Sequence, residues 1–205
     1  MNQVIEKNSD TIVIDTSTGV QVTQSIETFD LIPEKDPILA QVLPEFDFDN
    51  SPINTTDFAS SMVETCKKFN GYGLSANQCG FPYRMFVMGA GDEYVAFFNP
   101  VLMKTEGEVH MLEACLSYPG LSLRITRPEK IWVKYQDYNG EWKEANYVGI
   151  SARCWLHELD HMNGIVYTTQ AKPLALQSGL KKRTKMYKMM DRYLKAQQKM
   201  AQATQ

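Results

Sequence analysis

The sequence predicts an α+β protein in which mixed or antiparallel β-sheets surround a buried central helix, with a further helix at the C-terminus. Helical patterns occur at about residues 54–70, 151–162 and 177–198, whereas strand signals dominate between residues 85 and 147. Successive strands without intervening helices favour this class over βαβ alternation. A length of 205 residues suits one domain with tails.

The chain is predicted to divide into an N-terminal extension at residues 1–25, a main domain at 26–175 and a basic C-terminal helix at 176–205. The extension is rich in Thr, Asn, Ser and Asp, with a short strand signal at Thr11–Ile14. Prolines punctuate residues 36–52, which we expect to form a loop.

The first predicted helix begins at Asn54 or Thr55, because either side chain can cap it. Phe58 and Cys66 fall on its inner face at helical spacing. The helix ends near Asn70, before two glycines that reach left-handed conformations.

Segments rich in aromatic and β-branched residues predict the strands that follow. They are Arg84–Met88, Val95–Phe98 and Ile131–Tyr135. Tyr138–Gly140 is typical of a hairpin turn.

The second predicted helix runs from a cap at Ser151 to Met162 and ends at Asn163-Gly164. Apart from Arg153 and the polar groups of the HELDH segment, its residues are almost all apolar. We therefore expect this helix to be buried.

Two histidines in this helix indicate a divalent metal site. His157 and His161 are four residues apart and share one helix face. The adjacent Glu158 lies where a carboxylate can act as a general base toward a metal-bound water. The alternative interpretation is a pair of surface histidines on a polar turn.

A third ligand is needed to complete such a site, and two residues are candidates. Cys115 stands at a strand-to-turn transition, and thiolate sulfur is a good ligand for borderline metals. His110 is the rival, although alone on a strand it is more typical of a partly exposed sheet residue. The other cysteines, Cys66, Cys79 and Cys154, are expected to pack in the core.

The segment Gly71–Gln78 combines glycines and small residues with a terminal amide. Glycine lets a substrate backbone approach closely, and the Gln78 amide can donate a hydrogen bond to a developing oxyanion. Taken alone, the segment is equally consistent with a helix stop and a turn.

Three segments together resemble the signatures of the peptide deformylase family, which read GxGxAAxQ, EGCLS and HExxH in this order. They are Gly71–Gln78, Glu113–Ser117 and His157–His161. The resemblance covers roughly residues 27–170. It implies metal-dependent hydrolysis of the formyl group from N-formylmethionyl nascent peptides, with release of formate.

The resemblance also implies roles for individual residues. The metal ligands would be Cys115, His157 and His161, with Fe²⁺ as the metal and Ni²⁺ or Zn²⁺ as substitutes. Glu158 would be the general base, and the Gln78 amide and the Leu116 N–H would hold the oxyanion.

Substrate-binding residues follow from the same resemblance. The backbone of Tyr72-Gly73 would pair with the peptide. The candidates for the methionine pocket are Tyr72, Tyr118, Cys154 and the ring edge of His157. Glu113 and Arg127 match positions that brace the site. A plain surface ion pair is the alternative interpretation of those two residues.

Four residues depart from the family pattern: Ser75, Ala114, Leu156 and Ser122. Ser75 adds a hydroxyl near the site, and Ala114 replaces a glycine, which would narrow the cleft or strain the backbone. Leu156 removes a hydrogen-bonding side chain. Ser122 replaces a large residue in many relatives, a role that Arg124 could take.

Charge is distributed unevenly along the chain. Residues 170–205 hold nine of the 21 Lys and Arg and one acid, a net charge of +8, whereas residues 1–169 carry −11. Some family members dock on the ribosome through a basic C-terminal helix, so the resemblance implies the ribosome as a partner. Met186, Met190 and Leu194 instead suggest that part of the helix packs on protein.

The same residues leave other functions open. The alternatives are an HExxH metallopeptidase, another metal-dependent amidohydrolase, and a non-catalytic binder that keeps the metal for stability. No apolar run is long enough to cross a bilayer, and the first 20 residues lack a secretory signal. We expect a bacterial cytosol or the cytosol of a phage-infected host, with an organelle less favoured.

Overall fold

The computed structural model describes residues 11–14, 21–24 and 26–203, so most of the predicted N-terminal extension lies outside the described residues. The helices are α1 (Thr55–Lys68), α2 (Ile150–Met162) and α3 (Pro173–Ala203), with short 3₁₀ turns η1 (Pro37–Ala40), η2 (Ala76–Cys79) and η3 (Tyr167–Gln170). The strands are β1 (Thr11–Ile14), β2 (Gln21–Gln24), β3 (Gly73–Ser75), β4 (Met85–Ala90), β5 (Glu93–Glu106), β6 (Val109–Ala114), β7 (Ser122–Arg127), β8 (Lys130–Gln136) and β9 (Trp142–Val148).

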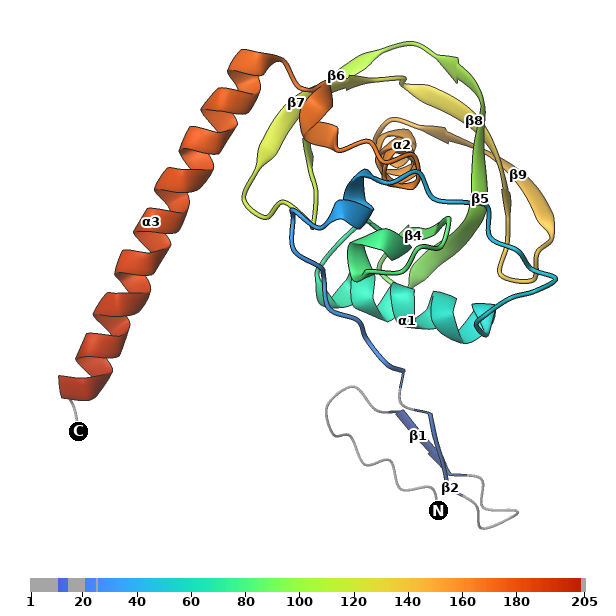
Figure 1. Ribbon diagram of the computed structural model, residues 1–205, viewed down its shortest axis with the longest axis horizontal. Coiled ribbons are helices and arrows are strands. Elements are labelled where there is room, and N and C mark those ends of the chain that lie inside the picture. Colours follow the sequence, from blue (N-terminus) through green and yellow to red (C-terminus); the bar gives the residue numbers. More distant parts are fainter. Residues whose placement is uncertain (1–10, 15–20, 25, 204–205) are drawn as a thin grey trace.

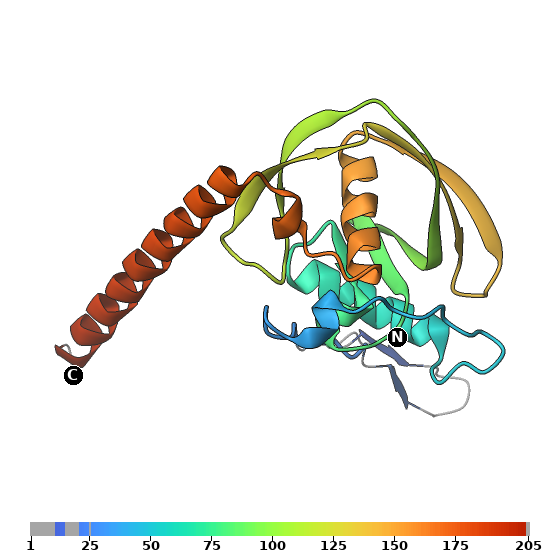
Figure 2. The ribbon, with the colours of Figure 1, turned by 45° about the horizontal axis from the view of Figure 1, so that its top comes forward.

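The described strands form three antiparallel sheets. The largest has the order β3-β4-β5-β8-β9, and β1-β2 and β6-β7 form two-stranded sheets. The large sheet and the β6-β7 pair curve around α2, which is seen end-on inside them in Figure 1 and from the side in Figure 2. The predicted α+β class with a central helix is confirmed.

Helix α2 forms the centre of the core. Trp155 and Met162 are fully buried and belong to a cluster with Phe86, Phe97 and Ile131 of the large sheet. The predicted burial of this helix is therefore confirmed. Each such side chain contributes about 1.5–3 kcal/mol by leaving water, which holds the helix, and every polar group on it, in one orientation.

The cap predicted for this helix is wrong by two residues. The N-cap is Gly149, at φ 62°, and Ser151 lies within the first turn. The chain leaves β9 and turns sharply into the helix, and glycine adopts the left-handed φ at that corner without strain. The predicted end at Asn163-Gly164 is confirmed.

Helix α1 and the strands follow the sequence pattern closely. The Asn54 side chain accepts hydrogen bonds from the N–H groups of Thr56 and Asp57, as expected of a cap. The predicted strand at Val95–Phe98 is part of the much longer β5, whose buried residues are 96–100. The rest of β5 was not predicted because Asn99-Pro100 interrupts the strand signal, although the strand continues to Glu106.

Helix α3 is longer than the predicted 177–198 because Pro173, whose φ suits a first turn, starts it. It leaves the body of the molecule and projects outward (Figures 1 and 2). In the described part of the chain, no helix is long and apolar enough to span a membrane. The division at residues 26–175 and 176–205 stays a prediction.

Candidate metal centre and active-site cavity

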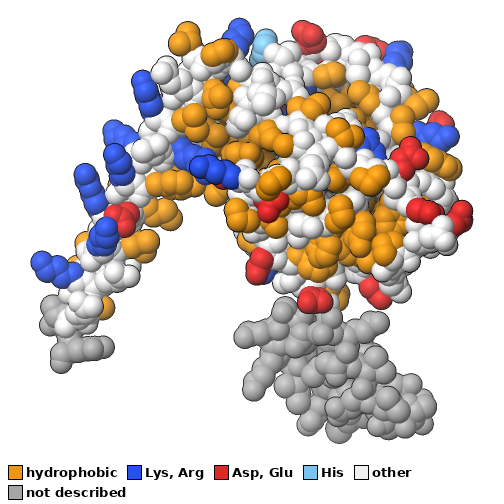
Figure 3. All heavy atoms as spheres, in the orientation of Figure 1, with side chains coloured by type: hydrophobic (Ala, Val, Ile, Leu, Met, Phe, Trp, Pro, Cys, Tyr) orange, Lys and Arg blue, Asp and Glu red, His pale blue; other side chains and the backbone are white. Residues whose placement is uncertain are grey.

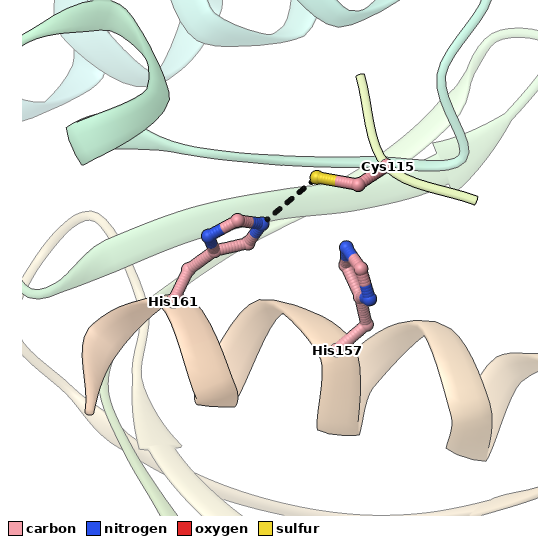
Figure 4. A group of neighbouring side chains, drawn as sticks. All are labelled: Cys115, His157 and His161. Carbon is pink, nitrogen blue, oxygen red and sulfur yellow. Dashed lines mark hydrogen bonds between the residues drawn. The ribbon is translucent and has the colours of Figure 1, made fainter. Parts of the chain in front are cut away.

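Cys115, His157 and His161 come together beneath the curved sheets. Their ligand atoms all lie within 4.8 Å of one another, and Cys115 Sγ lies 3.3 Å from His161 Nε2. Figure 4 shows both imidazoles rising from one face of α2 toward the thiol. His110 lies elsewhere, exposed on β6, with Nδ1 2.6 Å from Thr126 Oγ1. The structure thus places Cys115, and not His110, beside the two histidines.

This group fits a divalent ion. Metal–sulfur and metal–nitrogen bonds of about 2.3 and 2.0 Å set tetrahedral ligands about 3.5 Å apart, close to the separations here. All three side chains are buried, and one thiolate with two imidazoles suits a borderline transition metal. The three residues therefore form a candidate metal site, at which a catalytic ion would keep a fourth position for water or substrate.

The first histidine is oriented by a buried charge network. His157 Nδ1 lies 2.7 Å from Glu113 Oε1, which directs Nε2 toward the cysteine. Arg127 makes two hydrogen bonds to the Glu113 carboxylate, at 2.6 and 2.9 Å, and Arg153 Nη1 adds a third at 2.8 Å. Arg127 also pairs with Asp160 at 2.6 Å.

Burial of this network decides between two interpretations. Glu113 and Arg127 are only 6% and 5% exposed, so the surface ion pair considered for them is wrong. Burial alone would raise the pKa of Glu113, but hydrogen bonds from Arg127 and His157 outweigh it and hold that pKa well below its usual range. Glu113 is therefore a carboxylate that braces a candidate ligand.

Sequence reasoning missed Arg153 and Asp160 as members of this network. They lie four residues before and three after His157, which places all three on one face of α2. An arginine at such a position in an apolar helix signals a buried partner, because an isolated charge would not be buried there.

Glu158 faces the cavity beside the metal ligands. Its side chain is buried, and Oε2 has no hydrogen-bond partner among the described residues. Burial raises the pKa of this carboxyl to about 7, although the charge of His157 opposes the rise. A carboxyl with a pKa near neutrality can both accept and return a proton.

Gln78 presents its amide to the same place. Its Nε2 donates to Ser117 Oγ at 3.0 Å and lies 3.5 Å from Cys115 Sγ. Its Oε1 accepts from the Ser75 backbone N–H at 3.0 Å and lies 3.0 Å from the Ser75 hydroxyl. Because that end of the amide accepts, the NH₂ end points toward the thiol. The hydroxyl that distinguishes Ser75 from the family alanine thus lies against this amide.

A cavity of about 560 Å³ opens beside these groups. Its walls include Glu158, Gln78, Leu116, Tyr72-Gly73 and Cys154, together with apolar residues such as Met88, Leu112 and Ile150. A Cβ at Gly73 would lie 2.6 Å from Glu158 Oε1 and 2.9 Å from Cys154 Sγ, so a larger residue at this wall would displace these side chains.

Two predicted substrate-binding residues lie outside the cavity wall. Tyr118 packs on Tyr167, with ring centroids 5.7 Å apart, and its hydroxyl donates to the Glu34 carbonyl. Arg127 is occupied by its two carboxylates. Neither residue lines the cavity and the polar groups of both have protein partners, so a contact of either with the substrate stays a prediction.

The remaining departures from the family pattern are accommodated. Ala114 lines the cavity, and its backbone φ is not positive, so its methyl group narrows the cleft without straining the chain. Leu156 joins the core around α2. Ser122 pairs with Ala114 across β6 and β7 and is exposed.

Comparisons with known proteins agree with this geometry. The model of the polypeptide deformylase family matches residues 29–177. A peptide deformylase from Thermotoga sp. (strain RQ2) is 36% identical over 140 residues, which cover 67% of this chain and 84% of the relative. One from Chromobacterium violaceum is 39% identical over 130 residues, covering 60% and 78%.

Solved structures give the same result. The crystal structure of a peptide deformylase from Legionella pneumophila superposes with a TM-score of 0.70 at 29% identity, covering 80% of this chain and 98% of that one. The enzyme from Thermotoga maritima gives 0.65 at 32% identity, covering 72% and 99%. With the family model matching most of its length and a candidate metal-binding group in place, this chain belongs to the polypeptide deformylase family of metal-dependent hydrolases.

Proposed function

We propose that this chain removes the formyl group from N-formylmethionyl peptides at the cavity beside Cys115, His157 and His161. The observation that carries the proposal is the position of Glu158. This buried carboxyl group, whose Oε2 has no hydrogen-bond partner among the described residues, lines the cavity next to three candidate ligands. The catalytic roles proposed for individual residues rest on the membership of this chain in the family.

A metal ion held by the three ligands would supply a Lewis acid and an acidified water. Glu158 takes a proton from the water and later delivers it to the departing amine, so the formyl C–N bond is hydrolysed to formate and a free N-terminus. The Gln78 amide and the Leu116 N–H donate to the oxygen of the formyl group as it becomes negative. The low dielectric of the buried site strengthens these hydrogen bonds.

The metal is proposed to be Fe²⁺, with Ni²⁺ or Zn²⁺ able to replace it. One sulfur and two nitrogen donors bind each of these ions, and the Irving–Williams order places Ni²⁺ and Zn²⁺ above Fe²⁺ in affinity. Occupancy by iron would therefore reflect supply in the cell more than preference of the ligands. Metal analysis of protein purified without oxygen tests the identity.

The peptide is proposed to bind along β3, which stands at the edge of the large sheet and pairs there with β4. Gly73 brings the backbone close to Glu158 without a side chain in between. The methionine side chain would enter the apolar part of the cavity near Met88 and Cys154.

Formate release from formyl-Met-Ala-Ser by the Fe²⁺- or Ni²⁺-loaded protein tests the function. Glu158→Ala should retain the metal, because Glu158 is not among the ligands, while turnover falls by about 10²–10⁴-fold. A peptide with an acetylated N-terminus and internal amide bonds tests the metallopeptidase alternative. Cleavage of that peptide without formate release would contradict the deformylase proposal.

Helix α3 is proposed to bind the ribosome in the cytosol of a bacterium or of a phage-infected host. A basic stripe of exposed residues follows one face of the helix: Lys181, Lys185, Lys188, Arg192, Lys195 and Lys199. Their alternating spacing of four and three residues keeps them on one side, and Figure 3 shows Lys and Arg along the outer side of α3 with hydrophobic side chains toward the body. Such a stripe can contact RNA phosphates.

Co-sedimentation with ribosomes at increasing salt tests this binding. The test variant changes Lys188, Arg192, Lys195 and Lys199 to Gln. Their one described ion pair, Lys195 with Asp191, lies within the helix, so the packing of α3 against the body should be retained. We expect the variant to bind more weakly, and the slope of log K against log salt to become shallower by about 0.7–0.9 for each phosphate that the helix no longer neutralises. Equal, salt-insensitive pelleting of both proteins would contradict the proposal.

A further inference from the structure

The first turns of α3 are seated on the loop that follows Cys115. A Cβ at Gly179 would lie 2.9 Å from Leu123 Cδ2 and 3.0 Å from Leu121 Cδ1, so glycine brings the helix backbone against the start of β7. Two turns later, Met186 covers Gly120, where a Cβ would lie 2.2 Å from the Met186 methyl. The helix therefore packs closely on residues 120–123.

Two side chains of α3 add polar contacts to the same loop. The Tyr187 hydroxyl donates to the Pro119 carbonyl at 2.7 Å. Arg183 pairs with the Glu34 carboxylate, and the Glu34 carbonyl accepts the Tyr118 hydroxyl at 3.1 Å. Arg183 also lies over the Tyr187 ring, 5.3 Å from its centroid. Together these two side chains hold Tyr118 and Pro119 in place.

This loop leads directly to the candidate metal ligands. The Tyr118 N–H donates to the Cys115 carbonyl at 3.0 Å, which closes the turn after the cysteine. The Tyr118 ring contacts Tyr167, and the Tyr167 ring lies 5.5 Å from that of His157. A shift of Tyr118 or Pro119 would therefore move Cys115 through the backbone. The same shift would reach His157 through the ring of Tyr167.

We infer that Arg183 and Tyr187 are positioning residues, which hold the turn after Cys115 so that its thiolate stays aligned with the two histidines. The inference rests on the metal centre of the proposed function and assigns a second role to α3. Further along the helix, the described hydrogen bonds and ion pairs of residues 188–199 stay within α3. The base of α3 thus braces the site, whereas its outer half is available to a partner.

The test compares matched substitutions in one helix. Tyr187→Phe and Arg183→Ala remove the bracing interactions, and Tyr193→Phe and Arg192→Ala make the same chemical changes on the exposed outer half. Each full-length protein is loaded with Co²⁺, and two quantities are measured. They are the thiolate-to-metal absorption, which reports the Cys115–metal bond, and the rate of metal transfer to a chelator.

We expect metal loss about fivefold faster in Tyr187→Phe and about tenfold faster in Arg183→Ala, with altered thiolate absorption in both. Arg183→Lys, which keeps the ion pair with Glu34, should recover most of the loss. The two outer variants should match the wild type in both measurements.

Contrary outcomes are distinguishable. Wild-type absorption and metal release in the bracing variants, even with a lower melting temperature, would mean that α3 only adds packing and would overturn the inference. Absence of thiolate absorption from the wild-type protein would overturn both the metal centre and the brace. A wild-type protein that binds metal as expected but releases no formate would refute the proposed function and leave the bracing role standing on its own measurements.

Discussion

Replacing Glu113 by glutamine should separate the charge of this residue from its shape. The carboxylate accepts four hydrogen bonds, two from Arg127, one from Arg153 and one from His157. An amide has one oxygen and one NH₂ group, so in either orientation its NH₂ faces two donors. The substitution also leaves Arg127 with Asp160 alone and leaves Arg153 without a carboxylate partner among the described residues, so the interior carries an excess positive charge.

The expected loss follows from this geometry. Removing one partner of a buried ion pair destabilises a protein by about 3–5 kcal/mol, because the remaining charge stays desolvated. Loss of the carboxylate that orients a metal-binding histidine weakens metal affinity by about 10–100-fold. Glu113→Gln should therefore unfold at much lower urea concentration and release metal more readily, and the first effect should persist after metal is removed.

Urea denaturation of the metal-free protein and chelator competition for the loaded protein measure the two effects separately. The control is Glu141→Gln, which removes the exposed ion pair between Glu141 and Lys143 and should change neither quantity measurably. A loss below about 1 kcal/mol in the metal-free Glu113→Gln protein would refute the reasoning, since it would mean that the two arginines find water or other partners when Glu113 loses its charge.

Three further predictions follow from the site. Gln78→Ala should lower kcat about 10²–10³-fold with the metal content unchanged, measured by formate release and metal analysis, because it removes a donor to the oxyanion. Gly73→Ala should lower turnover at least tenfold in the wild-type protein but cause little further loss in the Glu158→Ala protein, since the new Cβ would lie 2.6 Å from Glu158 Oε1 and act through that side chain. Removing the metal with a chelator should lower the melting temperature measured by calorimetry, and metal added at 100 times its Kd should restore about 2.7 kcal/mol of folding free energy. An unchanged melting temperature would mean that the three ligands hold no ion in the folded protein.

The sequence was most informative where one local rule determines a structure. The cap at Asn54 and the burial of α2 each depend on side chains within a few residues, and both were predicted correctly. The spacing of His157 and His161 likewise places both rings on one helix face. These features require no knowledge of how distant segments pack.

Predictions failed where a feature depends on the packing of distant segments. Arg153 and Glu113 stand 40 residues apart in the sequence, and Arg127 comes from a third element, so no local pattern could reveal that one carboxylate satisfies two arginines. The extent of β5 was missed because Asn99-Pro100 interrupts the strand signal, although pairing with β8 continues beyond it.

The buried charge network explains why the central helix can carry a reactive site at all. A helix this deep in a core would be more stable with apolar residues at positions 153, 157 and 160, because burying ions costs more than their pairing returns. Glu113 changes that balance locally by accepting from two arginines and a histidine at once. The same carboxylate therefore offsets the cost of burial and fixes the ring of His157. Binding of a metal would add stability to a helix whose polar face otherwise lowers it, so we expect folding and metal affinity to be coupled in this protein.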